Sequence, residues 1–350
     1  MDRLGTRGLV GLVLASLIAL AAVPTAQAQQ SSAPVALRLS GTEGARAQYS
    51  WTTEGRVSFQ IPEDLVNNVP FDTRSPLKFK ATSLLSTSVR SADEQGMRLN
   101  MALDSIDLEA SGFGHGATVH ADKSAAKVRL DDETVFDSTQ GELASFPIAA
   151  LVFGREFLLL DFDRRADLRG ITTAGLLSTV ADTPALAKAF SELADLWPPI
   201  LPEGNVTAGD TWRSEVRFSV PELGIAGGGA LRFLYRGTTM EAGRRCASIG
   251  LRGQVGLSEM SLRELVGPVT DSGAMLLPSV PDVVLSGMAK LSGTVYLDPS
   301  TAELVRGQLD ADVTARFVAS ELDKRARVLM RLHSVLQRVP AGPDAAKPTH

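Results

Sequence analysis

Apolar and polar residues alternate along most of this chain, which is the period of a β-strand with one buried and one solvated face. The pattern is clear at Val35 to Leu39 and again at Ala47 to Trp51. It recurs over residues 77–88, 97–108, 117–122, 126–131, 157–162, 214–220, 229–235, 246–257, 288–297 and 303–318. These alternations predict a mainly antiparallel β fold of the α+β class, with curved sheets in two similar halves and a few helices packed against them.

Three segments carry apolar residues at helical spacing instead. Residues 176–196 have such a stripe, and the pair Pro198-Pro199 that follows cannot continue a helix. Ser320 to Val339 combines a capping pattern at its start with a leucine-rich stripe. A short helix near Leu143 to Phe153 is the third candidate. We expect the helix at Ser320 to Val339 to pack on a sheet; its basic face leaves an anionic membrane surface as the alternative.

The chain begins with the features of a secretory signal peptide. Basic residues precede an apolar run of about 15 residues, shorter than the roughly 20 that a spanning helix needs. The triplet Ala26-Gln27-Ala28 then predicts cleavage between Ala28 and Gln29. We therefore expect an exported protein, periplasmic or extracellular, with no membrane-spanning segment after cleavage.

Two pairs of segments indicate an internal duplication. Leu158 to Gly170 and Val295 to Gly307 both read as strand, Asp-led turn and return strand ending in Arg-Gly. Lys78 to Leu108 and Leu231 to Leu257 both read as two long strands around a polar, glycine-containing turn. The alternative is that any two β-hairpins resemble each other this much. The predicted organisation is a signal peptide at 1–28, β-rich halves at 29–200 and 201–339, and a disordered tail at 340–350.

A short motif lies where the two halves meet. Trp197 and Pro202 are followed by Val206-Thr207-Ala208-Gly209-Asp210-Thr211-Trp212. This stretch resembles a family of bacterial secreted and lipid-anchored proteins of unknown function, in which "LP" precedes "V-x-x-GD-x-W". The resemblance implies an exported β-rich domain, with no established catalysis to transfer. From the residues alone, Gly209-Asp210 predicts a turn, and Trp212 is either a structural anchor under the helix ending at Trp197 or a ligand-stacking ring.

Charge and cysteine content exclude several classes of protein. The formal net charge is −5, which argues against nucleic acid, because its binding depends on clustered Lys and Arg. The chain has one cysteine, Cys246, so no internal disulfide is possible. The residue directly after the predicted cleavage site is Gln29 rather than a cysteine, which excludes a lipid-modified N-terminus there. Cys246 itself is expected to be packed and inert, with activation by Arg244 and Arg245 as the alternative.

Candidate chemistry elsewhere in the chain is weak. Gly112 to Ala117 matches a dinucleotide fingerprint, but a strand pattern follows where a helix is needed, so we expect a hairpin loop. His115 and His120 lack further metal ligands at suitable spacing. Asp161, Asp163 and Asp167 lack the later ligands of a calcium loop. We predict no catalytic, cofactor or metal site.

The resulting hypothesis is an exported, non-catalytic envelope protein that binds a hydrophobic ligand, a lipid or an envelope partner. Small residues expected on inner strand faces leave volume for such a ligand: Ala81, Ala102 and Gly250. One alternative is a purely structural or protein-interaction module of the envelope. Another is a hydrolase without a recognisable motif.

Overall fold

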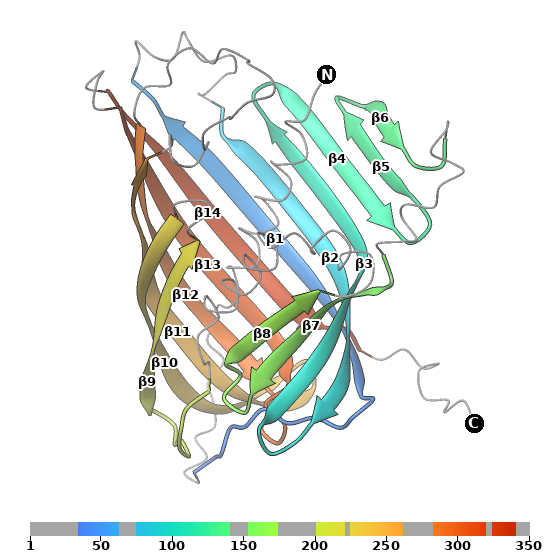
Figure 1. Ribbon diagram of the computed structural model, residues 1–350, viewed down its shortest axis with the longest axis vertical. Helices are drawn as coiled ribbons and strands as arrows, with labels where there is room; N and C mark the ends of the chain where they lie inside the picture. Colours follow the sequence, from blue (N-terminus) through green and yellow to red (C-terminus); the bar gives the residue numbers. More distant parts are fainter. Residues whose placement is uncertain are drawn as a thin grey trace, which may run out of the picture.

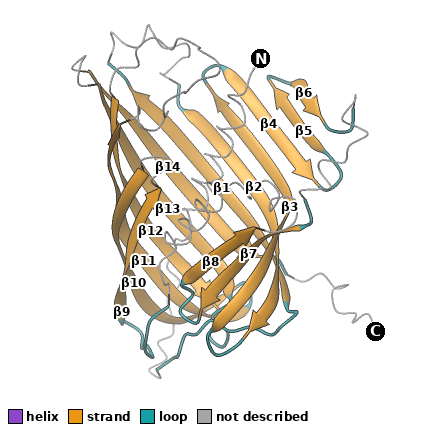
Figure 2. Cartoon of the chain, viewed as in Figure 1, coloured by secondary structure: helices purple, strands orange, loops and turns teal. Residues whose placement is uncertain are grey.

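The computed structural model describes seven stretches of the chain, residues 34–62, 75–140, 153–173, 201–220, 225–261, 283–319 and 324–340. Within them the chain forms one 14-stranded antiparallel sheet, drawn in Figures 1 and 2 as a strongly curved layer. The first strands are β1 (Arg46–Gln60), β2 (Leu77–Ala92), β3 (Gly96–Gly112), β4 (His115–Asp122), β5 (Ala126–Leu130), β6 (Glu133–Asp137), β7 (Glu156–Asp163) and β8 (Leu168–Thr173). The remaining strands are β9 (Thr211–Val220), β10 (Ile225–Glu241), β11 (Arg244–Ser261), β12 (Val283–Leu297), β13 (Leu304–Ala319) and β14 (Lys324–Arg338).

The first and last of these strands lie side by side in the middle of the sheet. β1 pairs with β14 from Tyr49 opposite Arg338 to Gln60 opposite Arg327. From this seam β2 to β6 follow one another on one side, and β13 back to β9 on the other. β7 leaves this order and pairs with β3, and β8 pairs with β7. The antiparallel prediction is confirmed, and the described parts of the two expected halves share one sheet.

The predicted fold class includes helices packed against the sheets, and this part of the prediction is wrong for the described residues, because none of them is helical. At Ser320 to Val339 the structure has β14 instead. From Ala326 to Leu336 the even-numbered residues are apolar or small, whereas most odd-numbered residues of β14 are Arg, His or Gln. This period of two suits a strand that is hydrogen-bonded on both sides, to β1 and to β13. The hydrogen bonds of β14 to two neighbouring strands, together with burial of its apolar face, outweigh the intrinsic helix preference of Arg, Leu and Met.

Several other expectations lie outside the described residues. These are the signal peptide at 1–28, the helix over 176–196 and the tail beyond Pro340. Of the short helix near Leu143 to Phe153, only Phe153 is described, and it lies in a turn. Among the residues that the structure does describe, no helix is long and apolar enough to span a membrane.

The sheet has one apolar and one polar face. On β1, alternate residues such as Thr53 and Val57 are buried, whereas their neighbours Glu54 and Arg56 are exposed. We call the first set the inner face and the second the outer face. The inner face lies on the concave side, because inner residues from strands far apart in the sheet belong to one hydrophobic cluster: Phe162 of β7, Trp212 of β9 and Leu309 of β13.

Two loop segments, residues 34–40 and 201–210, cover one end of the concave side, and we call them the floor. Val35 and Val206 join the two segments through an isolated β-bridge. Leu37 and Leu201 are 0% and 1% exposed and belong to the hydrophobic cluster. Figure 1 shows the first segment running across the lower end of the sheet. The floor thus covers this end of the concave side with apolar side chains.

Two hairpin turns hold the floor, and they are built alike. The Leu39 N–H donates to a carbonyl of the β7–β8 turn and the Ser40 N–H to one of the β12–β13 turn, both at 2.9 Å. These are the two Asp-led turns of the predicted duplication. In each, the leading carboxylate accepts the backbone N–H two residues further on, at 2.7 Å for Asp163 and 2.9 Å for Asp298. Each turn also contains a left-handed alanine, at φ 56° and φ 52°. The likeness favours the duplication, which stays a prediction.

Candidate functional site

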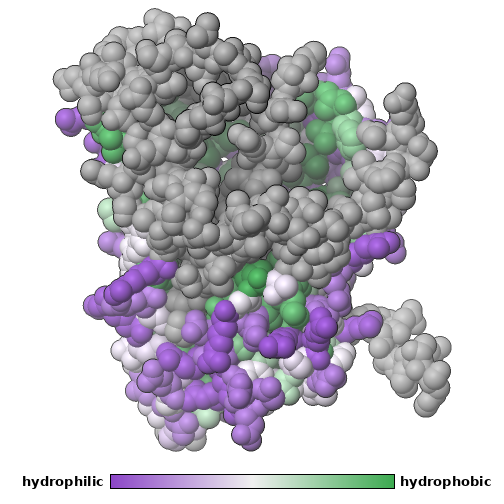
Figure 3. Space-filling model, viewed as in Figure 1, coloured by the Kyte–Doolittle hydropathy of each residue, from purple (hydrophilic) through white to green (hydrophobic). Residues whose placement is uncertain are grey.

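The inner face is densely packed at the floor and looser at the opposite end of the same strands. Near the floor, Ile249, Leu309 and Leu332 are between 0% and 8% exposed. Further along β11 to β14, the inner residues are only half-buried. They are Val255, Leu257, Leu285, Ala289, Val313, Ala315, Phe317, Ala326, Val328 and Met330, and we call them the open end. Figure 3 shows separate patches of apolar surface above a mostly hydrophilic lower rim.

Small residues account for the looser packing of the open end. The register places Gly229, Val255, Ala289 and Val313 in one row across β10 to β13. The next row contains Gly227, Leu257, Gly287 and Ala315. The first row therefore alternates valine with glycine or alanine, and the second has one leucine among two glycines and an alanine, so few large side chains cover the sheet there. Leu257 lies over its neighbour Gly287, where a Cβ atom would meet the leucine side chain at 3.1 Å.

Between the two ends, an aromatic ring lies over the inner face at the β1–β14 seam. Phe79 of β2 is directly opposite Gly55 of β1. A Cβ atom at position 55 would lie 2.3 Å from the Phe79 ring and 2.9 Å from Leu332 of β14. Gly55 is therefore required for Phe79 to cross the seam, and the ring separates the packed end from the open end.

Polar groups on the inner face lie towards the floor. The Arg338 guanidinium contacts the Glu303 carboxylate at 2.5 Å, and the Tyr49 hydroxyl donates to the same carboxylate at 3.5 Å. Burial, together with the Glu303 charge, raises the pKa of Tyr49 well above its usual range. Tyr49 is thus a neutral hydrogen-bond donor at physiological pH, and the polar character of the concave side is concentrated at its covered end.

The motif residues described by the structure form part of the floor. Gly209 has φ 102°, and its N–H donates to the Tyr235 carbonyl at 2.8 Å. The Asp210 carboxylate accepts the backbone N–H of Thr207 at 2.7 Å and its hydroxyl at 2.9 Å. These bonds lower the pKa of Asp210. The segment 207–210 is therefore tied both to itself and to β10.

The two remaining motif residues near the floor are packed against neighbours. Trp212 stacks on Phe233, with ring centroids 5.5 Å apart and an interplanar angle of 12°. The Pro202 carbonyl accepts a 2.7 Å hydrogen bond from the Arg38 guanidinium. Trp197, under whose helix Trp212 is predicted to insert, lies outside the described residues.

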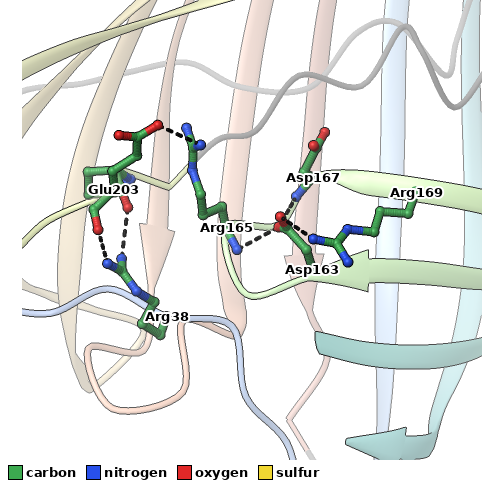
Figure 4. A network of polar contacts seen from close by, with 7 residues as sticks. Arg38, Asp163, Arg165, Asp167, Arg169 and Glu203 are labelled. Carbon is green, nitrogen blue, oxygen red and sulfur yellow. Dashed lines mark hydrogen bonds and ion pairs between the residues drawn. The ribbon is translucent and has the colours of Figure 1, made fainter. Parts of the chain in front are cut away.

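Figure 4 shows how charged side chains connect the floor to the β7–β8 turn. Arg38 donates to the backbone carbonyl of Glu203, whose carboxylate contacts Arg165 at 2.9 Å. Asp163 accepts N–H groups of its own turn and contacts Arg169 at 3.3 Å. Of the Asp residues considered for calcium, Asp163 is thus engaged by backbone amides and Arg169, and Asp161 contacts Arg98 at 3.2 Å. Within the described chain, no group of three or more His, Cys, Asp or Glu could hold a metal ion.

The other candidate residues have structural surroundings. Gly112 to Ala117 forms the β3–β4 hairpin, as predicted, with Phe113 and Gly114 at positive φ. Cys246 is 0% exposed, and burial raises the pKa of its thiol to about 11, so the packed cysteine is confirmed. The prediction for Gly250 is wrong: it lies on the outer face, where a Cβ atom would meet the Arg236 guanidinium at 2.8 Å.

Cross-strand histidine–aspartate pairs were not predicted. The Nδ1 atoms of His115, His120 and His333 lie 2.5, 2.6 and 2.8 Å from the carboxylates of Asp131, Asp107 and Asp310. All three pairs are exposed and join residues 13 to 23 positions apart. The sequence contains no local signal for them, because only the strand register brings the partners together.

A charged groove of about 1290 Å³ crosses the outer face from β13 to β5. One wall contains Arg331, Arg56 and Lys78, which lie opposite one another in register. The other wall contains His333, Glu54 and Lys80. Ion pairs neutralise much of this charge, including Lys80–Glu54 at 2.8 Å and Arg331–Asp312 at 3.2 Å. The groove therefore has no strong excess of either sign.

Comparison with known proteins identifies no family for this chain. No family model matches it, and no curated protein matches it. Similar solved structures include DynF from the dynemicin biosynthesis pathway of Micromonospora chersina, at 8% identity over 93% of this chain and 94% of that one, with a TM-score of 0.22. Others are the β domain of the Bordetella autotransporter BrkA (13% identity, 85% and 100% coverage, TM-score 0.22) and an outer membrane channel from Pseudomonas putida F1 (10%, 86% and 97%, 0.23). TM-scores this low transfer no function.

Proposed function

We propose that the protein binds an elongated apolar molecule, such as the acyl chain of a lipid, non-covalently on the inner face of its sheet. The observation that carries this proposal is the half-buried open end on β11 to β14. Apolar surface left partly exposed on a concave side favours a ligand that covers it. The ligand would lie along the strands from the open end towards Phe79.

The charge distribution supports a protein that binds the ligand on its inner face and is hydrated on its outer face. The outer face carries ion pairs on β1 and β2, β13 and β14, and β3 and β4, and such charges are stable in water. The half-buried apolar rows of the open end lie on the inner face, opposite these charges. Each methylene that a ligand buries there contributes about 0.8 kcal/mol, so a chain of about ten methylenes offsets the cost of ordering ligand and protein.

We also propose, on the sequence alone, that the protein works in the cell envelope after cleavage between Ala28 and Gln29. The motif from Pro202 to Trp212 resembles that of a family of exported bacterial proteins. We therefore also propose that this protein is related to that family. N-terminal sequencing of the protein from its host tests the cleavage. A product that starts at Met1 in a membrane fraction contradicts it.

Ligand binding is tested by extracting protein purified from its host with organic solvent and identifying released lipids by mass spectrometry. The matched variants are Ala315→Trp and Thr314→Trp, which introduce the same side chain at adjacent positions of β13. Ala315 lies on the inner face and Thr314 on the outer face. We expect Ala315→Trp to reduce co-purified lipid and the fluorescence of a bound hydrophobic probe at least about tenfold, because the indole fills the open end.

The control variant Thr314→Trp should keep lipid and probe binding at the wild-type level. Thermal unfolding of both variants shows whether each has folded. Lipid-free wild-type protein that also fails to bind the probe overturns the proposal and favours the interaction-module alternative. Equal losses in two folded variants also overturn it, because the inner face would then have no special part in binding.

A further inference from the structure

We propose that three arginines on the outer face of β9, β10 and β11 dock the protein onto an anionic phospholipid surface. They are Arg213, Arg232 and Arg252, and we call them the arginine row. This surface is separate from the ligand site, and its docking does not depend on the proposed ligand.

The register brings the three side chains together. Arg232 is directly opposite Arg213 on one side and Arg252 on the other. Neighbouring strands lie about 4.8 Å apart, and residues in such pairs project from the same face. Like charges placed directly opposite each other destabilise a sheet. The arrangement therefore costs stability in the isolated protein and becomes favourable when an anionic surface faces it.

Among the residues that the structure describes, nearby acidic side chains do not neutralise the row. Glu215 contacts Arg213 at 3.8 Å, but it also contacts Arg217 at 2.7 Å, so one carboxylate serves two cations. Arg232 and Arg252 are exposed and have no ion-pair partner among the described residues. Counted over the described residues, the patch has an excess of positive charge, although the whole chain has a formal net charge of −5.

An apolar side chain beside the row favours a lipid surface as its partner. Leu234 follows Arg232 by two positions on β10, so both project from the outer face, and Leu234 is 37% exposed. Arginines with an adjacent exposed leucine suit the boundary between headgroups and acyl chains. β9 ends the sheet order, so the arginine row lies on the outer face at one margin of the sheet (Figure 1).

The charged groove supplies a matched control. Arg331, Arg56 and Lys78 are also three cations opposite one another on adjacent strands. They differ in their surroundings, because Asp312, Glu54 and Asp310 line the same groove. Removing these three cations changes the net charge of the protein by the same amount as removing the arginine row.

Docking is tested by co-sedimentation of the full chain with phosphatidylcholine vesicles that contain or lack about one-third phosphatidylglycerol. We expect wild-type protein to bind only the anionic vesicles, and less well as salt is raised. Arg213→Gln/Arg232→Gln/Arg252→Gln should bind at least about tenfold more weakly, since each basic residue near an anionic surface contributes measurably. Arg331→Gln/Arg56→Gln/Lys78→Gln should bind within about twofold of wild type.

The proposal is overturned if wild-type protein binds the two vesicle types equally. It is also overturned by equal losses in the two triple variants, which would reflect net charge alone. Competition by free inorganic phosphate at millimolar concentration also overturns it, because the row would then bind single anions rather than a surface. The Ala315→Trp variant separates the proposals. It should still sediment with anionic vesicles while losing the apolar ligand.

Discussion

The hydroxyl groups of Thr53 and Ser334 lie 2.8 Å apart on the inner face, although 281 positions separate the two residues in the chain. Both are buried, at 2% and 1% exposure. Their hydrogen bond joins β1 to β14. The bond links the first and last described strands. Because β1 and β14 join the two sides of the sheet, this contact helps to keep the sheet continuous.

Removal of one member of this pair should destabilise the protein. Ser334→Ala leaves the Thr53 hydroxyl buried without its partner, and we expect a loss of about 1–3 kcal/mol in the free energy of unfolding. Thr53→Val/Ser334→Ala removes both hydroxyls and should cost less than the sum of the single changes. Denaturant unfolding of Ser334→Ala, Thr53→Val and the double variant measures the coupling. Additive losses contradict the assignment of a shared bond.

Gly55→Ala should destabilise the seam, because its Cβ atom would overlap the Phe79 ring at 2.3 Å. Overpacking of this kind costs about 1–3 kcal/mol. Gly204→Ala is the control, since a Cβ atom at that position meets no atom within 4 Å. Replacing Phe79 with Leu in the Gly55→Ala background should restore part of the loss. Equal unfolding midpoints for the two alanine variants contradict the clash.

The pair of His120 and Asp107 should make stability depend on pH. The hydrogen bond to Asp107 is the main cause that raises the pKa of His120 above 6.5. When folding raises the pKa of a group, that group stabilises the folded protein. The stabilisation is fully present below the pKa that the group has in the unfolded chain, and it is lost as pH rises through the pKa that it has in the folded protein. The pair is exposed, so its contribution is about 0.2–1 kcal/mol.

His120→Gln tests this dependence. We expect it to destabilise the protein at about pH 5.5 and to have little effect at about pH 8.5. Asp107→Asn removes the partner, and in that background His120→Gln should have a smaller effect at the lower pH. An identical destabilisation at both pH values indicates that His120 acts by packing rather than by charge.

Cys246 should resist thiol reagents in the folded protein. It is 0% exposed, and burial raises its thiol pKa to about 11, so little thiolate is present near neutral pH. We expect modification at least about 100-fold slower in native buffer than in denaturant, where the chain's one cysteine reacts fully. Rapid labelling of folded protein would revive the alternative of a thiol activated by Arg244 and Arg245.

The alternation of residues located the strands and one apolar face on each of them. That period also predicted the two Asp-led turns, because their flanking strands and turn residues are local features. The same reasoning placed a helix over β14, whose sequence carries both periods. Only its neighbours decided between them: β1 and β13 provide hydrogen bonds on both sides, and the concave side accepts Leu332 and Met330.

The candidate sites show the same division. The sequence by itself determined that inner faces would be apolar and contain small residues, because side-chain character and strand period are properties of each segment. It could not determine which segments pair or in what register. The arginine row, the bond between Thr53 and Ser334 and the outward position of Gly250 all depend on that register. Only the tertiary structure decided them, because a shift of one residue between neighbouring strands exchanges the side chains of the two faces.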